Sequence, residues 1–573
     1  MAQINKKDVI GLLEKIALYL ELKGENPFKV SAYRKAAQAL ETDNRSLSEI
    51  EDFTALNGIG KGTAAVIAEY IQQGTSETLS NLEREIPAGL IPLLNLPGLG
   101  GKKLAKLYQE LGVTDAESLR EACTSGKVAE LKGFGKKTSE KIVKALDEAD
   151  SQPDRLPIAT MLPIVEKIEA YLEGINAVLR YSRAGSIRRM RETVKDLDFI
   201  IASDRPDKVR DELLAIVNIK EVIASGDTKV SIVLEESYDV SVDFRIVKSE
   251  QFTTTLHHFT GSKDHNVAMR QRAKVQNEKI SEYGVENNDT GEVITFETEK
   301  DFFQHFGLSY IPPEVRENAG ELEVFEQEVS LINHSDIKGD LHMHTTWSDG
   351  AQSVEEMVIA AVERGYHYIA ITDHSKFLKV ANGLNEVRLR EQREEIERLK
   401  QKYPAIHIFS GVEMDILPNG NLDFDDAFLK EMDYVIGAIH SSFNQTEEEI
   451  MKRLYHACDN PYVTIIAHPT GRIIGRRRGY QANVKKLIER AKETGTVLEL
   501  NANPNRFDLA PEWLRLAQEQ GVKIAINTDA HNEVSLDYMK DGVRVAKRGW
   551  LKKDTVINTW SKEEVINLFQ SKR

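Results

Sequence analysis

Three acidic residues in the middle of the chain have the types and spacing of a site that transfers phosphoryl groups. Asp196 and Asp198 alternate along an expected strand, so both carboxylates point to the same face. Asp243, on a second expected strand, supplies a third carboxylate. Carboxylates gathered in this way suit Mg²⁺ or Mn²⁺, and a pair of such ions supports nucleotidyl transfer. An Asp-x-Asp pattern alone is more often a solvated strand edge.

A glycine–serine turn and two arginines precede these acids and argue against a solvated edge. The amides and hydroxyl of Gly185 and Ser186 can hold a triphosphate, and Arg188 and Arg189 add positive charge. Residues 184–199 as a whole resemble the nucleotidyltransferase signature Gly-Ser-x-Arg-Arg…Asp-x-Asp. This signature leaves the acceptor open, because RNA-tailing and antibiotic-modifying transferases share it.

A second group of possible ligands follows Ile337, and its members lie at or near the C-terminal ends of apolar runs, where α/β barrels assemble their sites. We call it the C-terminal ligand set: His342, His344, Asp349, His374, Glu413, His440, His468, Asp529 and His531. These groups exceed the needs of one tetrahedral ion, so we expect two or three ions. Glu413 is the expected bridging carboxylate in a site for phosphoester hydrolysis. Any one of the histidines alone could be a buried residue bonded to the backbone, but the set together argues against this.

Strands and helices must alternate to position both sites. In the middle of the chain, strands are expected at 197–202, 230–234 and 240–247. After Ile337 they are expected at 340–344, 368–372, 407–412, 434–439, 463–467, 497–500 and 523–527. Most of the latter alternate with helical segments, which implies a parallel α/β sheet or barrel.

The first 150 residues consist of short expected helices separated by three glycine-centred turns, at 56–62, 96–102 and 131–137. Each Gly-x-Gly leaves amides at the N-terminus of the next helix facing outward, where they can hold a phosphate. The glycines concerned are Gly58, Gly60, Gly98, Gly100, Gly133 and Gly135. A single copy would more often be an ordinary turn, but three copies resemble helix-hairpin-helix motifs, which grip DNA backbones without reading sequence.

Residues 26–37, the glycine turns and the Phe-Thr-Gly-Ser stretch at 259–262 together resemble the X-family DNA polymerases over residues 1–315. The resemblance implies a lyase-like helical domain, a fingers-type segment, a palm and a thumb. It also implies a nucleotide site that includes His258, Phe259, Gly261, Ser262 and Asn266, and a DNA contact at Arg270.

Two positions depart from that family. Relatives usually carry Tyr where this chain has His258, so the exclusion of ribonucleotides is an open question. The position of the Schiff-base lysine of lyase-active relatives falls on Val66, which has no amine nucleophile. We therefore expect no lyase activity through this residue, although another lysine could serve.

The C-terminal ligand set resembles the polymerase-and-histidinol-phosphatase (PHP) domain, with every motif position filled. The resemblance covers about residues 337–573 and implies phosphoester hydrolysis with two or three Mn²⁺ or Zn²⁺ ions. Arg472 and the run 476–478 are expected either near a DNA backbone or as a solvated charge run, and the sequence does not separate these alternatives.

The expected fold class is multidomain: a helix-hairpin-helix N-terminal region, an α+β nucleotidyltransferase palm with a thumb, and a C-terminal α/β domain with a distorted (βα)7 barrel. The expected boundaries are 1–85 (lyase-like helical domain), 86–150 (fingers-type segment), 151–258 (palm), 259–315 (thumb), 316–336 (linker) and 337–573 (PHP domain).

Composition limits the class of protein but does not settle its partner. The net charge of −16 neither supports nor excludes DNA binding, because binding depends on where Lys and Arg lie. The two cysteines are far apart, which favours a reducing cytoplasm over a disulfide scaffold. No apolar run reaches the length of a membrane span, and a monomer is the default expectation.

The expected function is gap-filling DNA synthesis in repair, with gapped or primed DNA and dNTPs as substrates and Mg²⁺ or Mn²⁺ at the palm. The PHP domain is expected to act on DNA 3′ ends, as a 3′–5′ exonuclease, a 3′-phosphatase or an abasic endonuclease. Two alternatives stay open: a PHP domain that hydrolyses a small-molecule phosphoester, and a scaffold that binds damaged DNA without catalysis.

Overall fold

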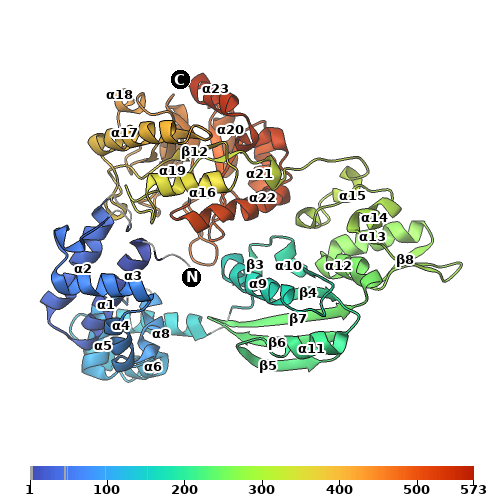
Figure 1. Cartoon of the computed structure of the whole chain (residues 1–573), viewed down its shortest axis with the longest axis horizontal. Coiled ribbons are helices and arrows are strands. Elements are labelled where there is room, and N and C mark those ends of the chain that lie inside the picture. The colour runs from blue at the N-terminus through green and yellow to red at the C-terminus, as the bar shows by residue number, and fades with distance from the viewer. Residues whose placement is uncertain (1–3, 5, 44–46, 48–49, 97–98, 151–152) are drawn as a thin grey trace.

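The computed structural model describes all residues of the chain except 1–3, 5, 44–46, 48–49, 97–98 and 151–152. Figure 1 shows a helical N-terminal region on one side, a five-stranded sheet with its helices beside it, and a smaller region of helices and hairpin beyond the sheet. The C-terminal barrel lies above these three parts (Figure 1). Among the described residues, no helix has the length and apolar character needed to cross a membrane.

The N-terminal region is helical because its apolar residues recur on one face of each helix and meet in one core. Asn26 caps the second helix by accepting from the amide of Phe28, and Pro27 occupies its first position. The helices are α1 (Lys6–Lys23), α2 (Pro27–Thr42), α3 (Lys61–Gln73), α4 (Glu77–Glu85), α5 (Gly101–Leu111), α6 (Ala116–Thr124), α7 (Lys127–Glu130) and α8 (Lys136–Asp150). Val66 of α3 lies in their shared core, buried with Ile67 and Leu82.

The palm is a mixed sheet with the strand order β2-β4-β7-β6-β5, in which β4 and β7 are parallel. These strands are β2 (Arg180–Arg183), β4 (Leu197–Ala202), β5 (Ile219–Ser225), β6 (Lys229–Glu235) and β7 (Asp239–Val247), with a short pair β1 (Leu156–Pro157) and β3 (Thr193–Val194) beside them. The helices are α9 (Ile158–Glu173), α10 (Gly185–Arg188) and α11 (Pro206–Leu213). Along β7, Val242 and Phe244 are buried in the core, so Asp243 points to the opposite face.

The thumb follows, with α12 (Phe252–Thr260), α13 (Lys263–Val275), the hairpin strands β8 (Glu278–Ile280), β9 (Val285–Asn287) and β10 (Val293–Ile294), α14 (Glu299–His305) and α15 (Glu321–Val324). The expected palm–thumb boundary at 258/259 falls inside α12. This helix joins both parts, because Phe252 packs with Ile200 of the palm while His257 packs on Phe302 of the thumb. The expected linker 316–336 contributes Phe325 to the thumb core, so it is a packed segment.

Residues 337–573 form two parallel sheets that together make up the wall of one barrel. Their strands are β11 (Gly339–Asp340), β12 (Tyr368–Ile371), β13 (His407–Ser410), β14 (Glu413–Asp415), β15 (Val435–Ala438), β16 (Val463–Ile466), β17 (Val497–Asn501) and β18 (Ile524–Asn527). Backbone bridges Met343–Ala530 and His374–Glu413 connect the two sheets and close the barrel. The expected parallel α/β barrel is confirmed.

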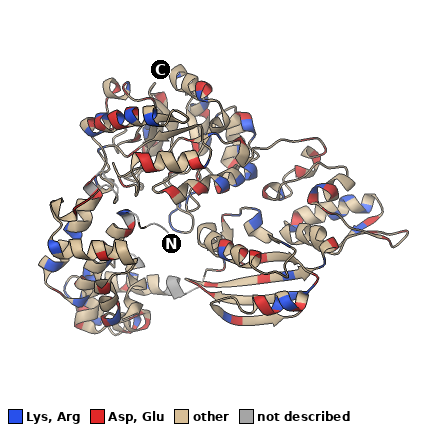
Figure 2. Ribbon diagram, viewed as in Figure 1, with Lys and Arg blue, Asp and Glu red and all other residues tan. Residues whose placement is uncertain are grey.

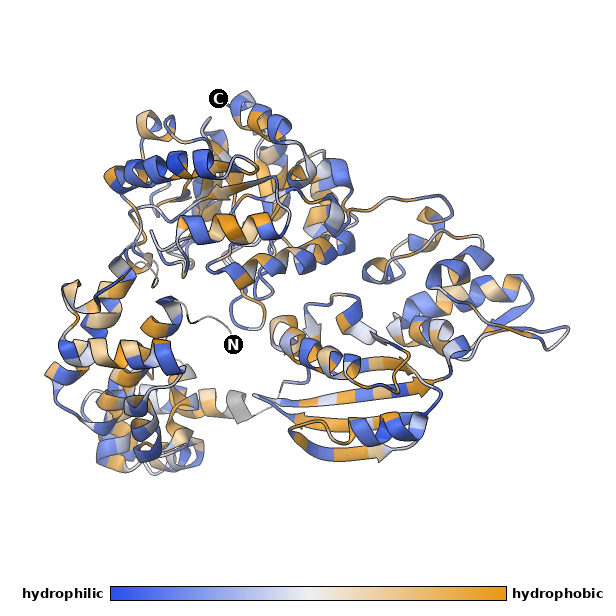
Figure 3. Ribbon diagram, in the orientation of Figure 1, coloured by the Kyte–Doolittle hydropathy of each residue, from blue (hydrophilic) through white to orange (hydrophobic). Residues whose placement is uncertain are grey.

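Helices cover the outside of this barrel: α16 (Val354–Glu363), α17 (Glu386–Lys402), α18 (Asp426–Leu429), α19 (Glu447–Asp459), α20 (Val484–Thr494), α21 (Pro511–Glu519), α22 (Tyr538–Arg548) and α23 (Lys562–Ser571). Figure 3 shows hydrophobic bands on the strands, whereas α17 is hydrophilic along most of its length. In Figure 2, Lys and Arg alternate with Asp and Glu along α17. The outer side of such a helix faces solvent, and its mixed charges form no surface patch of a single sign.

The strands are shorter than expected where ligands follow them. β11 ends at Asp340, so His342 and His344 lie beyond the strand and not on it. Backbone pairing continues there only as the isolated bridge at Met343, and side chains accept from backbone amides: that of His342 donates to Asp340 Oδ1 and that of Met343 donates to Thr372 Oγ1. The prediction of a strand across 340–344 is therefore wrong. Asp196 similarly precedes β4.

Candidate active sites

The palm acids converge because β4 and β7 are parallel neighbours. Asp198 and Asp243 are paired in register, and Asp196 comes just before β4. Burial first, and then the negative charges of Asp196 and Asp243, raise the pKa of Asp198 to about 7. Like-charged carboxylates held together in this way fit a divalent cation, which would offset their repulsion.

Gly185 lies directly against this acid cluster. Its φ of +61° places it in the left-handed region, and an added Cβ would lie 2.3 Å from Asp198 Oδ2. The amide of Ala184 donates to the carbonyl of Asp198 at 2.7 Å, and α10 begins at Gly185. Ser186 follows in the same turn. The Gly-Ser turn is thus in direct contact with both the backbone and the side chain of Asp198.

Two residues of β6 that were not predicted from the sequence contact Asp243. Lys229 Nζ lies 3.2 Å from Asp243 Oδ2, and the hydroxyl of Ser231 donates to Asp243 Oδ1. Ser231 and Asp243 are cross-strand partners in the ladder. Sequence alone gave no signal for this pair, because it depends on the β6–β7 register.

The two signature arginines are held by thumb carboxylates. Arg188 donates to Glu299 Oε2 at 2.7 Å and to the hydroxyl of Thr260 at 2.6 Å. Glu299 also accepts from Arg316 at 2.6 Å. Burial alone would raise the pKa of Glu299, but the guanidinium groups of Arg316 and Arg188 hold it well below its usual range. The charge of Arg188 is therefore already balanced within the protein.

Arg189 has a different set of partners. Its Nε donates to Glu317 Oε1 at 3.1 Å, and its Nη1 donates to the carbonyl of Thr260. An added Cβ at Gly261, which has a φ of +68°, would lie 3.1 Å from the same Nη1. Arg189 therefore packs against the Phe-Thr-Gly-Ser turn.

The remaining residues of the expected nucleotide site lie on α12 and α13. The guanidinium of Arg245 lies 4.9 Å from the ring centre of Phe259. Asn266 donates to the carbonyl of His258 at 2.7 Å, and burial lowers the pKa of His258. The side chain of Ser262 caps α13. Arg270 is exposed on α13, where a DNA strand could reach it.

The glycine turns precede helix N-termini. Gly60 is the N-cap of α3, Gly100 is the N-cap of α5, and Gly135 precedes α8. Gly58 and Gly133 have φ values of +113° and +95°, which only glycine adopts without strain. Gly98 lies outside the described residues. Each described turn can present amides to a phosphate.

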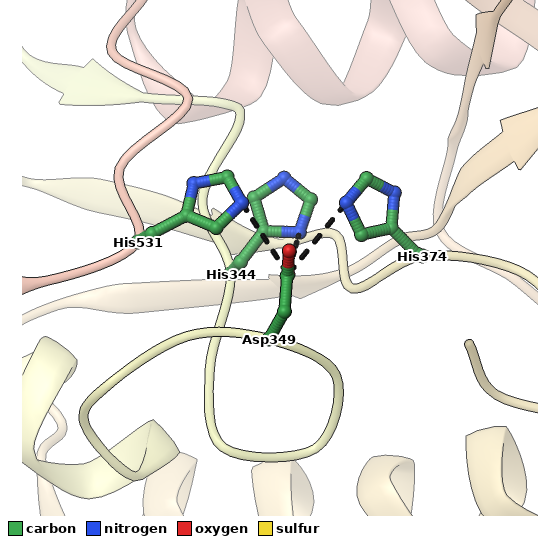
Figure 4. Close-up of side chains that lie close together, drawn as sticks. All are labelled: His344, Asp349, His374 and His531. Atoms are coloured by element: carbon green, nitrogen blue, oxygen red, sulfur yellow. Dashed lines mark ion pairs between the residues drawn. The ribbon is translucent and has the colours of Figure 1, made fainter. Parts of the chain in front are cut away.

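The C-terminal ligand set comes together at one end of the barrel. Three groups have ligand atoms close enough to share an ion. They are His344, Asp349, His374 and His531; His342, His344 and Asp529; and His374, Glu413 and His440. Figure 4 shows the first group, in which three imidazoles surround the Asp349 carboxylate. His344 and His374 each belong to two groups, so neighbouring ions would share ligands.

Glu413 lies at the centre of the set. Its Oε1 is 2.9 Å from His468 Nε2 and 3.2 Å from His440 Nε2, while its Oε2 is 2.9 Å from His374 Nδ1 and 3.4 Å from His342 Nε2. Burial would raise the pKa of Glu413, but the surrounding histidines hold it well below its usual range. His344 Nε2 is also 3.5 Å from Oε2, so five imidazoles surround one buried carboxylate, which fits a bridging ligand between cations.

A second layer of carboxylates orients these histidines, and the sequence analysis missed it. Glu499 Oε1 lies 2.7 Å from His342 Nδ1, and Asp415 Oδ1 lies 3.2 Å from His440 Nδ1. A proton on Nδ1 would donate to each carboxylate, and Nε2 would then be the atom that binds a cation. Glu499 interrupts the apolar run of β17, and that break was the one available signal in the sequence.

The arginine-rich loop after His468 packs on the palm. Arg472 Nη2 donates to Glu192 at 2.8 Å, and an added Cβ at Gly475 would lie 2.6 Å from Pro157. Arg476 and Arg478 are exposed. The sequence left two alternatives for these arginines, a DNA contact or a solvated charge run. The structure adds a third, because Arg472 lies in an interface between the barrel and the palm.

Models of known families match four segments. They are a helix-hairpin-helix domain at 4–76, a SAM-like helix-hairpin-helix tandem at 90–148, a DNA polymerase beta thumb at 255–317 and a PHP domain at 340–503.

Individual relatives cover the whole chain or one half. The chain is 60% identical over 562 residues to a Bacillus subtilis protein named DNA polymerase/3′-5′ exonuclease PolX, covering 98% of this chain and 99% of the relative. It is 31% identical over 235 residues to a Thermoanaerobacter protein named "Probable phosphatase", covering 38% of this chain and 89% of the relative. It is 23% identical over 333 residues to DNA polymerase lambda of Rattus norvegicus, covering 53% of this chain and 55% of the relative.

Proposed function

The chain belongs to the family of the DNA polymerase/3′-5′ exonuclease PolX, and from this premise we propose that it fills short gaps in DNA while its barrel trims DNA 3′ ends. The resemblance to X-family polymerases with a PHP domain is confirmed, as is the multidomain fold class. The chain is an enzyme with a nucleotidyltransferase half and a metal-dependent phosphoesterase half.

In the polymerase half, the carboxylates of Asp196, Asp198 and Asp243 would hold Mg²⁺ or Mn²⁺, as their convergence and the raised pKa of Asp198 support. Such ions supply charge neutralisation at the transferring phosphoryl group. The Gly185-Ser186 turn donates to the triphosphate. Nucleotidyl transfer joins the 3′-hydroxyl oxygen to the α-phosphorus and releases pyrophosphate.

The other expected contacts surround that turn. Arg189 adds positive charge beside the triphosphate, while Arg188, already paired with Glu299, holds the turn against the thumb. The incoming nucleotide would lie along the turn of the thumb, with His258, Phe259, Gly261, Ser262 and Asn266 lining it. The DNA backbone would rest on the glycine turns, and Arg270 would face the DNA.

In the barrel, the observation that carries the proposal is the central Glu413, with five imidazoles close to its two oxygens. The C-terminal ligand set would hold two or three Mn²⁺ or Zn²⁺ ions, which supply a nucleophile from water and neutralise phosphoryl charge. Glu499 and Asp415 keep the Nε2 atoms of His342 and His440 directed at the site. Hydrolysis releases a nucleotide and leaves a 3′-hydroxyl for the palm.

A small-molecule phosphoesterase is the second candidate for the barrel, because a relative named probable phosphatase matches 38% of this chain over 89% of its own length. The full-length match to an exonuclease favours a DNA substrate. A non-catalytic scaffold would not need the complete ligand set that the barrel keeps. We further place the protein in the cytoplasm as a monomer, with its two free, buried cysteines in keeping with a reducing compartment.

One substrate tests both halves: a gapped duplex with a 5′-labelled primer, incubated with Mg²⁺ or Mn²⁺, with and without dNTPs. Asp196→Ala with Asp198→Ala should abolish extension and leave shortening of the primer intact. His342→Ala with His344→Ala should do the reverse. Both activities surviving in both double variants would refute the two-site assignment, and a wild-type protein that hydrolyses small phosphoesters but not the primer would favour the second candidate.

A further inference from the structure

One helix of the barrel reaches the palm loop that carries Arg188, Arg189 and Met190, which we call the nucleotide loop. α22 carries Arg544 and Arg548 one turn apart, so both guanidinium groups project from one face. Arg544 Nη2 donates to the carbonyl of Arg188 at 2.9 Å, and Arg548 Nη1 donates to the carbonyl of Arg189 at 3.1 Å. Figure 1 shows α22 on the side of the barrel that faces α10 and β3.

The same guanidinium groups also bind two carboxylates of residues 314–317, one of which holds Arg189 as well. Arg544 Nε donates to the buried Glu314 at 3.1 Å. Glu317 Oε1 accepts from Arg548 Nη1 and from Arg189 Nε, both at 3.1 Å. Arg548 and Arg189 therefore share one carboxylate, and any movement of Arg548 changes the surroundings of Arg189.

The loop needs support of this kind. Met190, directly after the arginine pair, has a φ of +54°, a left-handed conformation that residues with a side chain rarely adopt. Met190 is buried, so the turn is fixed on its inner side. On its outer side, the carbonyls of Arg188 and Arg189 accept from the two arginines of α22.

We propose that Arg544 and Arg548 are positioning residues for DNA synthesis, through which the barrel holds the palm's nucleotide loop in its triphosphate-binding form. The two guanidinium groups donate to consecutive backbone carbonyls of the loop. A contact that served only to join two surfaces would not need to match consecutive carbonyls. The inference rests on the proposed function, since Arg189 must contact the nucleotide for its placement to matter.

Steady-state extension of a gapped primer by the full-length chain, with Mg²⁺ and a titrated dNTP, tests this role. The double variant Arg544→Gln, Arg548→Gln should raise the KM for dNTP about tenfold with kcat changed less than about twofold. Trimming of a single-stranded primer without dNTP should not change. Lys540→Gln, which removes an exposed charge from the same helix, is the matched control and should leave KM unchanged.

Two further variants separate positioning from folding. Arg548→Lys keeps a charge near Glu317 but lacks the fork that reaches two acceptors, so its KM should fall between wild type and Arg548→Gln. In an Arg189→Gln background, Arg548→Gln should have no further effect on KM, because it acts through Arg189.

The outcomes are distinguishable. An unchanged KM in Arg189→Gln overturns the assignment of Arg189 to the nucleotide and this inference with it. A raised KM in Arg189→Gln with an unchanged KM in the Arg544→Gln, Arg548→Gln variant overturns the inference alone. If that double variant loses trimming and extension together, α22 supports the fold as a whole and the positioning role is refuted.

Discussion

Gly185 faces Asp198 so closely that an added Cβ would lie 2.3 Å from the Oδ2 atom of the acid. The backbone of the Gly185-Ser186 turn and the Asp198 carboxylate are thus in contact, with no side chain between them. A metal ion on Asp198 and a phosphate on the Gly185-Ser186 turn would consequently be neighbours, as nucleotidyl transfer requires.

Gly185→Ala should lower primer extension at least about 100-fold, because the methyl group must displace Asp198 or unwind the left-handed turn. Trimming by the barrel should be unchanged. Gly291→Ala makes a matched control, since Gly291 also has a positive φ, +72°, but open space around its Cβ. Normal extension by Gly185→Ala would show that the turn and the acid move independently.

Glu499→Gln should reduce trimming about 10- to 100-fold, because His342 would lose the carboxylate that fixes its Nδ1 proton. The apparent Kd for Mn²⁺ should rise, measured by titration of the protein with the metal. Glu493→Gln, on the exposed side of α20, is the control. Extension should not change in either variant, and an equal loss of both activities would contradict a local role.

Binding of Mn²⁺ to the palm should weaken as pH falls below about 7, the raised pKa of Asp198 in the metal-free protein. The ion binds the ionised carboxylate, so the apparent Kd should increase about tenfold for each further pH unit. Calorimetric titration in a His342→Ala, His344→Ala background reduces the barrel's contribution. Adding Asp198→Asn to this variant should remove the pH dependence. An apparent Kd that does not change with pH in the variant that keeps Asp198 would refute the prediction.

The same pKa shift has a consequence for metal-free stability. Because the folded state binds the Asp198 proton more tightly than the unfolded chain, protonation of this group stabilises the fold at low pH. That stabilisation is lost as pH rises from the ordinary pKa of 3.8 through about 7. Thermal unfolding in the presence of a chelator should show this loss of stability with rising pH in the protein that keeps Asp198 and not in Asp198→Asn.

Glu299→Gln should destabilise the junction of palm and thumb by about 3 kcal/mol, because Arg188 and Arg316 would share a buried site with no anion. Hydrogen exchange of the amides of α12 and α14 measures this locally. Glu286→Gln, which breaks an exposed pair with Lys279, should change exchange little. Equal protection in both variants would mean that the buried triad contributes no stability.

Much of both sites could be predicted because their motifs are local. Asp196 and Asp198 lie beside the Gly-Ser turn in sequence, and most members of the C-terminal ligand set directly follow apolar runs. The prediction was wrong for the strand of His342 and His344, because the amides of His342 and Met343 donate to the side chains of Asp340 and Thr372 and only an isolated backbone bridge remains there.

The contacts that could not be predicted join distant parts of the chain. Arg544 and the carbonyl of Arg188 are 356 residues apart, and Glu499 lies 157 residues after the histidine that it orients. Lys229 reaches Asp243 because of the register between two strands, which a charge pattern does not reveal. Periodicity and spacing describe neighbours along the chain, and these contacts depend on tertiary structure.

The support that α22 gives to the palm limits how this protein can be divided. A gene truncated before the barrel would encode the palm and thumb intact, yet it would discard the two guanidinium groups that hold the carbonyls of Arg188 and Arg189. Such an excised polymerase would keep its acids and still need an excess of dNTP. A rearrangement that separates the polymerase half from the barrel must therefore replace these two contacts. The barrel would accordingly be retained even in a lineage that no longer used its hydrolytic site.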